Sequence, residues 1–375
     1  MVKRVIPWLA LGAVALSVHT AWNVRQLRRP NPPDHDVAEK IAVLIPARDE
    51  QDHIAATIQS AQNQDHVGAL QIHVLDDGSH DATCEIAQSL AELDPRIHIH
   101  QQPDQDPPAG WLGKNYACAQ LASLADQDST VFVFLDADVV LEPHAVSTLA
   151  HELRSGDFQL VAPYPRQTAD GLLERLIQPL LVWSWATTVP LAIAERRQWA
   201  SMSVANGQLM AFDVDGYRSI GGHATVRGEV IEDVALMRQV RQAGLRAATI
   251  DGSHLATCRM YSSTRDLVDG YTKSAWNAFG GVAGSIAVNS TLVGLYVVPA
   301  LAALFGSGRN RRWGLVGYTA GVAGRILVAR RTGERALPDA LAHPGSVLAF
   351  VMINGASWWR HLSGTTQWKG RAIHV

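Results

Sequence analysis

Short apolar runs alternate with helix-like patterns over the first third of the chain. Four runs rich in β-branched and aromatic residues are predicted to be strands: 41–45, 71–75, 97–100 and 131–135. Helical spacing of apolar positions separates them and predicts helices over 54–62, 83–93 and 116–125. Strands that alternate with helices of this length indicate an α/β fold with a doubly wound, mostly parallel sheet.

Longer apolar segments lie at both ends of the chain. Four have about the length that a bilayer requires of a helix: 5–24, 286–305, 313–329, which Arg325 interrupts, and 341–359. A fifth segment, 172–194, contains charged residues and two prolines. We interpret it as a pair of helices lying in the membrane interface. The alternative is a buried core helix of the soluble domain.

These segments define a domain organisation. We expect an N-terminal transmembrane helix over 1–24, a linker over 25–39, an α/β domain over 40–280 that includes the interfacial helices, and C-terminal transmembrane or interfacial helices over 281–375. Arginines gather directly after the first apolar segment, which places the α/β domain in the cytoplasm. We therefore expect a multi-pass protein of the cell (inner) membrane. Every C-terminal loop is basic, so the number and direction of the later spans stay open.

Composition excludes some functions. The formal net charge is -3, with 18% charged residues, so the chain has no overall basic character and we expect no nucleic-acid partner. The three cysteines are scattered without a Cys-x-x-Cys spacing, which argues against a disulfide framework or a zinc site. No Gly-x-Gly-x-x-Gly follows the first predicted strand, and no phosphate-loop lysine motif occurs, which argues against two common nucleotide sites.

Acidic residues follow three of the predicted strands. Asp49 and Glu50 come after the first, Asp76 and Asp77 after the second, and Asp136-Ala137-Asp138 after the fourth. The carboxyl ends of parallel strands meet at one edge of a sheet, where α/β proteins bind ligands. Two carboxylates spaced i, i+2 in extended chain face the same side and suit Mg²⁺ or Mn²⁺ carrying a phosphate. The alternative is that Asp136 and Asp138 only cap the next helix.

Taken together, these motifs resemble a known family. Three of them, Pro46-Ala47-Arg48-Asp49-Glu50, Asp76-Asp77-Gly78-Ser79 and Asp136-Ala137-Asp138, occur in the order typical of family 2 glycosyltransferases of GT-A fold. The resemblance covers residues 40–280 and includes 207–212 and 231–233. Further motifs are similar to the membrane-bound branch that includes carotenoid and hopanoid-associated glycosyltransferases: Trp111-Leu112-Gly113-Lys114, Arg259-Met260-Tyr261 and Trp368-Lys369-Gly370-Arg371.

The resemblance implies roles for single residues. The donor, a nucleotide sugar, would be bound by Pro46, Ala47, Asp49, Glu50, Asp76, Asp77, Lys114 and Asp136. The metal, Mg²⁺ or Mn²⁺, would be held by Asp138 together with Asp136. The general base would be Asp233, with Glu232 beside it. The acceptor or phosphate side would be formed by Gly207, Gln208 and Arg259.

Four of these residues also have a plainer structural interpretation. Glu232 and Asp233 could only begin the helix predicted over 234–242, where acidic side chains suit the helix dipole. Lys114 could be a solvated surface lysine, and Arg259 could form a surface salt bridge.

The glycine-rich stretch 221–228, just before the Glu-Asp pair, is interpreted as a flexible lid over the site.

The resemblance also implies the reaction. We expect inverting, metal-dependent transfer of a single sugar, from a UDP-hexose, to a hydroxyl or carboxyl of a lipid or isoprenoid-like acceptor in the membrane. The Gln-x-x-Arg-Trp motif of polymerising members is missing from the sequence, which disfavours a polysaccharide synthase. The alternatives are a polyprenyl-phosphate glycosyltransferase, a non-catalytic membrane scaffold that keeps the fold, and a nucleotidyltransferase of similar sheet topology.

Overall fold

The computed structural model describes residues 2–365, 367–368 and 371–372. Contacts within it divide the chain into two compact units that interleave along the sequence. The sheet unit comprises Arg28–Arg166 and Ile193–Arg259, and the helical unit comprises the segments up to 27, 167–192 and from 260 onward. The predicted α/β domain of 40–280 includes stretches that this division assigns to the helical unit. The domain boundaries given by the sequence stay a prediction.

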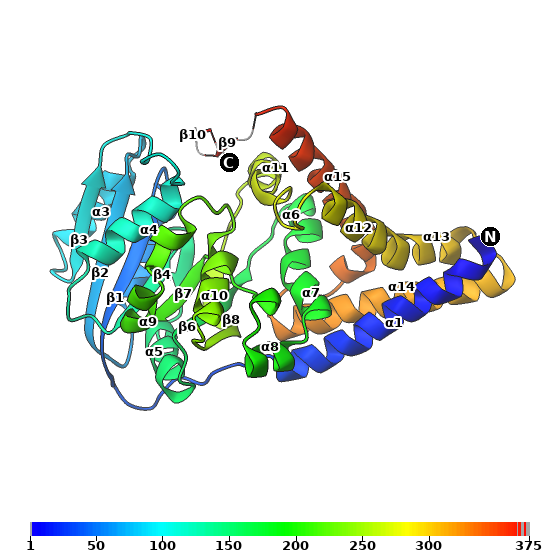
Figure 1. Ribbon diagram of the computed structural model, residues 1–375, viewed down its shortest axis with the longest axis horizontal. Coiled ribbons are helices and arrows are strands. Elements are labelled where there is room, and N and C mark those ends of the chain that lie inside the picture. The colour runs from blue at the N-terminus through cyan, green and yellow to red at the C-terminus, as the bar shows by residue number, and fades with distance from the viewer. Residues whose placement is uncertain (1, 366, 369–370, 373–375) are drawn as a thin grey trace. The chain divides into compact units, whose positions relative to one another are not determined.

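One eight-stranded sheet forms the centre of the sheet unit, with the strand order β3-β2-β1-β4-β7-β6-β8-β5 (Figure 1). Its first four strands are parallel: β1 Val37–Ala47, β2 Val67–Asp77, β3 Ile97–Gln102 and β4 Val131–Leu135. All four predicted strands are therefore confirmed, and β3 is the edge strand. Ala47 lies opposite Asp76 and Leu44 opposite Phe134, so the ends of β1, β2 and β4 meet at one edge.

The sheet continues beyond β4 with antiparallel pairs that the sequence pattern did not reveal. β7 Leu209–Asp213 pairs with β4 on one side and with β6 Leu160–Gln167 on the other. At the far edge, the short strand β5 Val139–Leu141 pairs with β8 Ala247–Cys258. The α/β class and the parallel half agree with the prediction, and the whole is a mixed, GT-A-like sheet.

Helices pack around this sheet. They are α2 Ile54–Gln62, α3 Thr83–Ala91, α4 Gly113–Leu124, α5 Ala145–Ser155, α9 Val214–Ser219 and α10 Glu232–Gln242, with short 3-10 turns η1 Ala200–Met202 and η2 Gly222–Val226. The three predicted helices correspond to α2, α3 and α4. Every residue of β4 is buried, as expected of a strand covered on both faces. Phe132, Phe134, Phe212 and Tyr217 form an aromatic core beside it.

The helical unit contains most of the apolar segments. Its elements are α1 Val2–Gln26, α6 Leu172–Ile177, α7 Pro179–Thr188, α11 Thr264–Ser274, α12 Val282–Leu292, the π-helical turn η3 Val293–Val297, α13 Val298–Phe305, α14 Gly308–Arg331, η4 Asp339–Ala342, α15 His343–Leu362, β9 Gln367–Trp368 and β10 Arg371–Ala372. α8 Leu191–Arg197 crosses the boundary between the units. Lys369 and Gly370, part of the terminal motif, lie outside the described residues.

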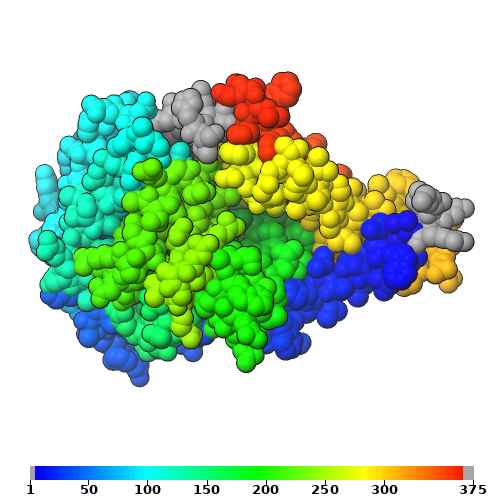
Figure 2. Space-filling model, in the orientation of Figure 1, coloured from blue at the N-terminus to red at the C-terminus, as the bar shows by residue number. Residues whose placement is uncertain are grey.

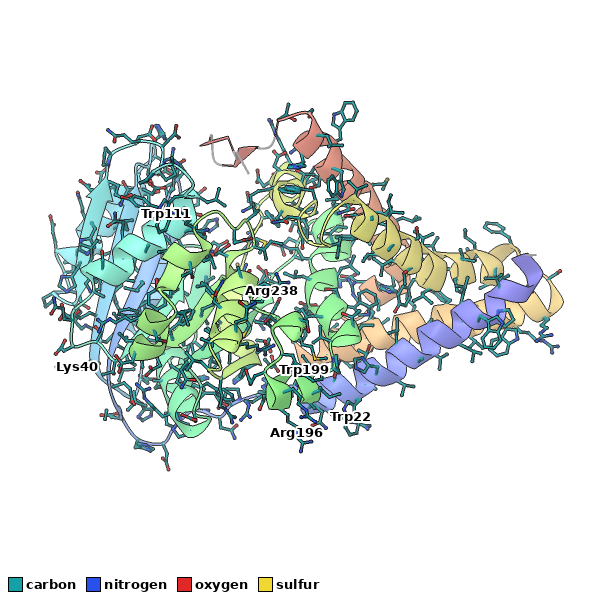
Figure 3. The ribbon with its side chains drawn as sticks, in the orientation of Figure 1. Trp22, Lys40, Trp111, Arg196, Trp199 and Arg238 are labelled. Atoms are coloured by element: carbon teal, nitrogen blue, oxygen red, sulfur yellow. The ribbon has the colours of Figure 1, made fainter. Side chains whose placement is uncertain are left out.

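Three helical stretches in the described part of the chain are long and apolar enough to cross a membrane: Val5–Gln26, Val282–Phe305 and Asp339–Leu362. Three of the four predicted spans thus coincide with candidates. The segment 172–194 forms two helical arms, α6 with α7 over Leu172–Thr188 and α8 over Leu191–Arg197, bent by 68° at Val189 and Pro190. This agrees with the predicted pair, whereas its interfacial position stays a prediction. Trp22, labelled in Figure 3, is 57% exposed near the end of α1.

The fourth predicted span, 313–329, lies in α14 but does not meet the same criteria. Charged and small residues lower its hydropathy. Its glycines instead allow close helix packing, because a Cβ at Gly314 would lie 2.4 Å from the backbone N of Ala303 on α13, and one at Gly317 would lie 3.2 Å from the Cα of Ala10 on α1. The helices α1 and α14 accordingly run side by side in Figure 1, and the surface of α1 is the dark blue ridge in Figure 2.

Asn23 fastens α1 to the bend between α7 and α8. Its buried amide donates to the carbonyls of Ala186 at 2.8 Å and Val189 at 2.7 Å, and accepts from the N–H of Leu191 at 3.2 Å. Replacing Asn23 with Ala leaves these groups unsatisfied, at about 1–3 kcal/mol for each one that stays buried.

We therefore expect Asn23→Ala to lower the thermal unfolding temperature of the detergent-solubilised protein by several degrees. Gln26→Ala, which removes an exposed amide from the same helix, is the matched control and should change little. Equal unfolding temperatures for the two variants would contradict this role of Asn23.

Candidate active site

The loops that follow β1 and β2 are joined by hydrogen bonds. The N–H of Asp49 donates to Ser79 Oγ at 3.0 Å, and its carboxylate accepts from the N–H of His80 at 2.8 Å. Arg48 Nη1 donates to the carbonyl of Asp77 at 2.5 Å. Asp49 holds a left-handed backbone with φ of 52°, which this double bonding stabilises. The first two acidic strand ends are thus brought together, as predicted.

Other members of the predicted donor set lie on the same two strand ends. Asp76 and Asp77 are buried, at 6% and 9% exposed, and Asp76 pairs in register with Ala47. The N–H of Glu50 donates to Thr83 Oγ1 at 2.7 Å, at the start of α3. Pro46 precedes Ala47 at the end of β1 and is partly exposed. These carboxylates and backbone groups could bind a polar, hydroxyl-rich ligand at the sheet edge.

Lys114 connects the third acidic strand end to the Glu-Asp pair. It lies in the first turn of α4, after the loop that contains Trp111, which is labelled in Figure 3. Its Nζ lies 2.7 Å from Asp136 Oδ1 and 3.1 Å from Glu232 Oε1, and it donates to the carbonyl of Gly207 at 3.2 Å. Burial disfavours the charge of Lys114, but the carboxylates of Asp136 and Glu232 outweigh it and hold its pKa well above its usual value. Lys114 is therefore a partly buried ion-pair partner instead of a free surface lysine.

Asp233 lies in the first turn of α10, beside this ion pair. Its Oδ2 accepts from the N–H of Gly207 at 2.8 Å, and its Oδ1 accepts from the N–H of Val234 at 2.7 Å. Burial and the neighbouring charge of Glu232 raise the pKa of Asp233 to about 7, against the opposing effect of those N–H groups and of Lys114. A carboxyl group that titrates near neutral pH can accept a proton, which is what a general base requires. The acidic pair also starts the helix, as the plainer interpretation expects, and the role of Asp233 as a base stays a prediction.

The backbone of Gly207 contacts both Asp233 and Lys114. Its N–H binds Asp233, and its carbonyl binds Lys114. A Cβ at this position would lie 2.8 Å from Glu232 Oε1 and 3.2 Å from Lys114 Nζ, which is too close for an ordinary contact. Glycine therefore lets the backbone approach both charged groups.

Gln208 and Arg259, which the sequence assigned with Gly207 to the acceptor side, lie differently. Gln208 is buried, and its side chain contacts Asn206 and Cys258 behind the strand end. Arg259 is exposed and directly follows Cys258, whose backbone pairs with Val139. Arg259 could reach a ligand, whereas Gln208 faces the interior. Their roles stay predictions.

The expected lid over 221–228 is a helical turn held by hydrogen bonds. η2 covers most of it, and His223 is 1% exposed, with its ring bonded to the hydroxyl of Tyr217 at 2.8 Å. Burial lowers the pKa of His223 to about 3, so it is neutral at pH 7. The glycines suggested a flexible loop, but His223 and Val226 insert into the core.

Asn115 is a residue that the sequence did not single out. Its buried amide donates to the carbonyls of Val226, Arg227 and Glu229 at 2.9, 3.2 and 3.0 Å. It therefore ties the start of α4, next to Lys114, to the segment that leads into Glu232 and Asp233. No local pattern announces this contact, because its partners are more than a hundred residues away.

The metal prediction rests on Asp136 and Asp138, which directly follow β4. Within the residues that the structure describes, no group of three or more His, Cys, Asp or Glu side chains could hold a metal ion. Mg²⁺ and Mn²⁺ at nucleotide sites need only one or two carboxylates, since substrate phosphates supply further oxygen ligands. The two hard carboxylate donors at this strand end fit that chemistry.

Comparisons with known proteins agree with this geometry. Residues 42–218 match the family model described as Glycosyl transferase family 2. The chain is 24% identical over 347 residues to the 4,4'-diaponeurosporenoate glycosyltransferase of Staphylococcus aureus strain USA300, covering 89% of this chain and 88% of that protein. The mannosyltransferase PcManGT from Pyrobaculum calidifontis, solved with GDP-Man and Mn²⁺, matches with a TM-score of 0.59 and 16% identity, covering 94% of this chain and 99% of that one. The family match over 42–218 agrees with the predicted family, and the predicted fold is confirmed.

Gly207→Ala is expected to abolish most sugar transfer. The added methyl group would push apart Glu232 and Lys114 and weaken the N–H bond to Asp233, although α10 and β7 should stay folded. The measurement is the amount of glycosylated product in membranes of cells that express the variant at wild-type level.

Gly345→Ala is the matched control, since a Cβ there would meet nothing within 4 Å. Wild-type activity in Gly207→Ala would mean that the close approach at Gly207 is not needed.

Proposed function

We propose that this chain, whose residues 42–218 match glycosyltransferase family 2, is a member of that family and transfers a single sugar from a nucleotide sugar to a membrane lipid-like acceptor with inversion at the anomeric carbon. The observation that carries the proposal is the set formed by Asp136, Lys114 and Glu232, which Gly207 joins to Asp233 through its backbone. It joins a group suited to a leaving diphosphate with a group suited to an attacking hydroxyl. Both requirements of a displacement reaction are met within one unit of the fold.

The donor side is proposed to use the acidic strand ends. Asp138 with Asp136 would hold Mg²⁺ or Mn²⁺, which neutralises charge on the departing nucleoside diphosphate when bound. Lys114 would add a second positive charge beside Asp136. The nucleoside of the donor, a UDP-hexose, would lie against Pro46, Ala47, Asp49, Glu50, Asp76 and Asp77. The neighbour PcManGT is solved with a nucleotide sugar and Mn²⁺, which supports this donor class by fold alone.

The base side is proposed to use Asp233. The proton of an acceptor hydroxyl would pass to its carboxylate while the oxygen attacks the anomeric carbon. General-base assistance of this kind typically contributes about 10²–10⁴-fold, and it works best when the pKa of the base lies near the working pH. The pKa of Asp233, about 7, fits this requirement. The negative charge of Glu232 raises the pKa of Asp233, and the positive charge of Lys114 lowers it.

The acceptor is proposed to be a lipid-like molecule with a terminal hydroxyl or carboxyl. Three candidate spans in the helical unit support a membrane-bound enzyme, and arginines after the first one support a cytoplasmic sheet unit at the cell membrane. The Staphylococcus relative is named for a carotenoid acid, which favours a carotenoid-like carboxyl acceptor. The raised pKa of Asp233 instead favours a hydroxyl, because a carboxylate needs no base.

The direct test compares lipid extracts by mass spectrometry from cells with and without the gene. A gain of one hexose on one lipid class in cells that have the gene supports the proposal. Loss of only a soluble or polymeric glycan when the gene is removed would refute it.

Asp233→Asn then identifies the acceptor group. For a hydroxyl acceptor we expect the product to fall by about 10²–10⁴-fold, because the base is lost. For an already ionised acceptor, a carboxylate or a polyprenyl phosphate, we expect most activity to remain. Asp215→Asn, which alters an exposed carboxylate on α9, is the matched control. Full activity of Asp233→Asn on a proven hydroxyl acceptor would rule out the base.

A further inference from the structure

Four side chains form a chain of hydrogen bonds behind the Asp136-Ala137-Asp138 strand end. Asn206 Nδ2 lies 2.9 Å from Gln208 Oε1, and Gln208 Nε2 lies 2.9 Å from Cys258 Sγ. The thiol of Cys258 is in hydrogen-bonding contact with the carboxylate of Asp138. Backbone bonds hold the ends of this chain, since the N–H of Asp136 donates to the carbonyl of Gln208 at 3.0 Å and Cys258 pairs with Val139.

The direction of each bond in this chain follows from chemistry. Asn206 donates through its amide nitrogen and accepts from the N–H of Gln208 through its oxygen at 3.1 Å, which fixes both amide orientations. Gln208 must then present its NH₂ group to Cys258, so the sulfur is the acceptor of that bond. The thiol proton is left for the next partner, and a carboxylate can only accept. Cys258 therefore donates to Asp138.

Three of the four hydrogen-bonded side chains are buried away from solvent. Asn206, Gln208 and Cys258 are 6%, 3% and 1% exposed, while Asp138 is partly exposed at the strand end. A buried chain of aligned donors holds its last member in one orientation, because any rotation would leave a buried polar group unpaired. The carboxylate of Asp138 is the group that this arrangement orients.

We propose that Cys258 is a positioning residue that holds the Asp138 carboxylate for the divalent cation, with Gln208 and Asn206 fixing the thiol. The proposal rests on the metal role of Asp138 under the proposed function. It also gives Gln208 a task that the sequence did not suggest, since Gln208 would act through Cys258 and not on the acceptor. Groups that orient metal ligands typically alter metal affinity about 10–100-fold when removed.

The rival arrangement is direct ligation of the metal by the Cys258 sulfur. A thiolate ligand would favour soft ions such as Cd²⁺ over Mn²⁺, whereas a neutral thiol that only orients an oxygen ligand would not. Serine distinguishes the two, because its hydroxyl can still donate to Asp138 but is a poor ligand for a soft ion.

The experiment uses the full chain in detergent and two probes, Mn²⁺ alone and Cd²⁺ alone. Free Mn²⁺ is followed by electron paramagnetic resonance, and Cd²⁺ binding is measured by calorimetry. We expect Cys258→Val and Cys258→Ala to weaken Mn²⁺ binding by about 10-fold or more. Cys258→Ser should keep most of the affinity for both ions. Cys84→Ala, which removes another free thiol of the sheet unit, should match the wild type.

Two results would overturn the proposal. Wild-type Mn²⁺ affinity in Cys258→Val, with binding lost in Asp138→Asn, would show that Asp138 needs no help from the thiol. A selective loss of Cd²⁺ binding in Cys258→Ser would identify the sulfur as a ligand.

Failure of the proposed function looks different, since Asp138→Asn would then leave Mn²⁺ binding unchanged. If Cys258→Val does not fold, Gln208→Leu tests the same chain from its other end and should also weaken Mn²⁺ binding.

Discussion

The ion pairs of Lys114 are the interaction on which the site depends. Asp136 follows β4 and Glu232 begins α10, so the two carboxylates come from elements far apart in the sequence. Without a shared cation, these carboxylates and Asp233 would repel one another in a partly buried site. One ammonium group, within 2.7 and 3.1 Å of the two acids, lets the strand end and the helix start approach. The same charge lowers the pKa of Asp233 and keeps it within the neutral range.

Hydrogen bonds of neighbouring residues hold the elements that carry Lys114 and its acidic partners together. Gly207 supplies an N–H to Asp233 and a carbonyl to Lys114 from a position where an added Cβ would displace the ends of the Glu232 and Lys114 side chains. Asn115, one residue further along α4, holds the segment that enters α10. The antiparallel strand β7 begins directly after Gly207 and Gln208 and carries both against β4. The half of the sheet that the sequence pattern did not reveal is therefore the half that completes the site.

Local patterns were sufficient for the parallel strands, for α2 and for the acidic strand ends, because strand periodicity and turn chemistry are properties of neighbouring residues. They could not predict β5 or β7, which are short and depend on their partners for stability. Lys114 looked equally like a surface residue, since its ion-pair partners are distant in the sequence. Cys258 looked like a small apolar core residue, and only the fold places it beside Asp138. The glycines over 221–228 predict a flexible lid. The structure instead holds His223 in the core by a hydrogen bond to Tyr217, which the glycine pattern does not reveal.

The central claim is that Lys114 couples Asp136, the proposed donor-side carboxylate, to Asp233, the proposed base. The most direct measurement is the pH dependence of kcat/KM for Lys114→Met against the wild type. Because the proposed base, Asp233, would act in its ionised form, activity should rise with pH through its pKa, near 7 in the wild type. Removing the positive charge leaves Glu232 and Asp136 uncompensated, so the rising limb should move to higher pH. A limb that stays at the same pH, whatever the loss in rate, would contradict the coupling.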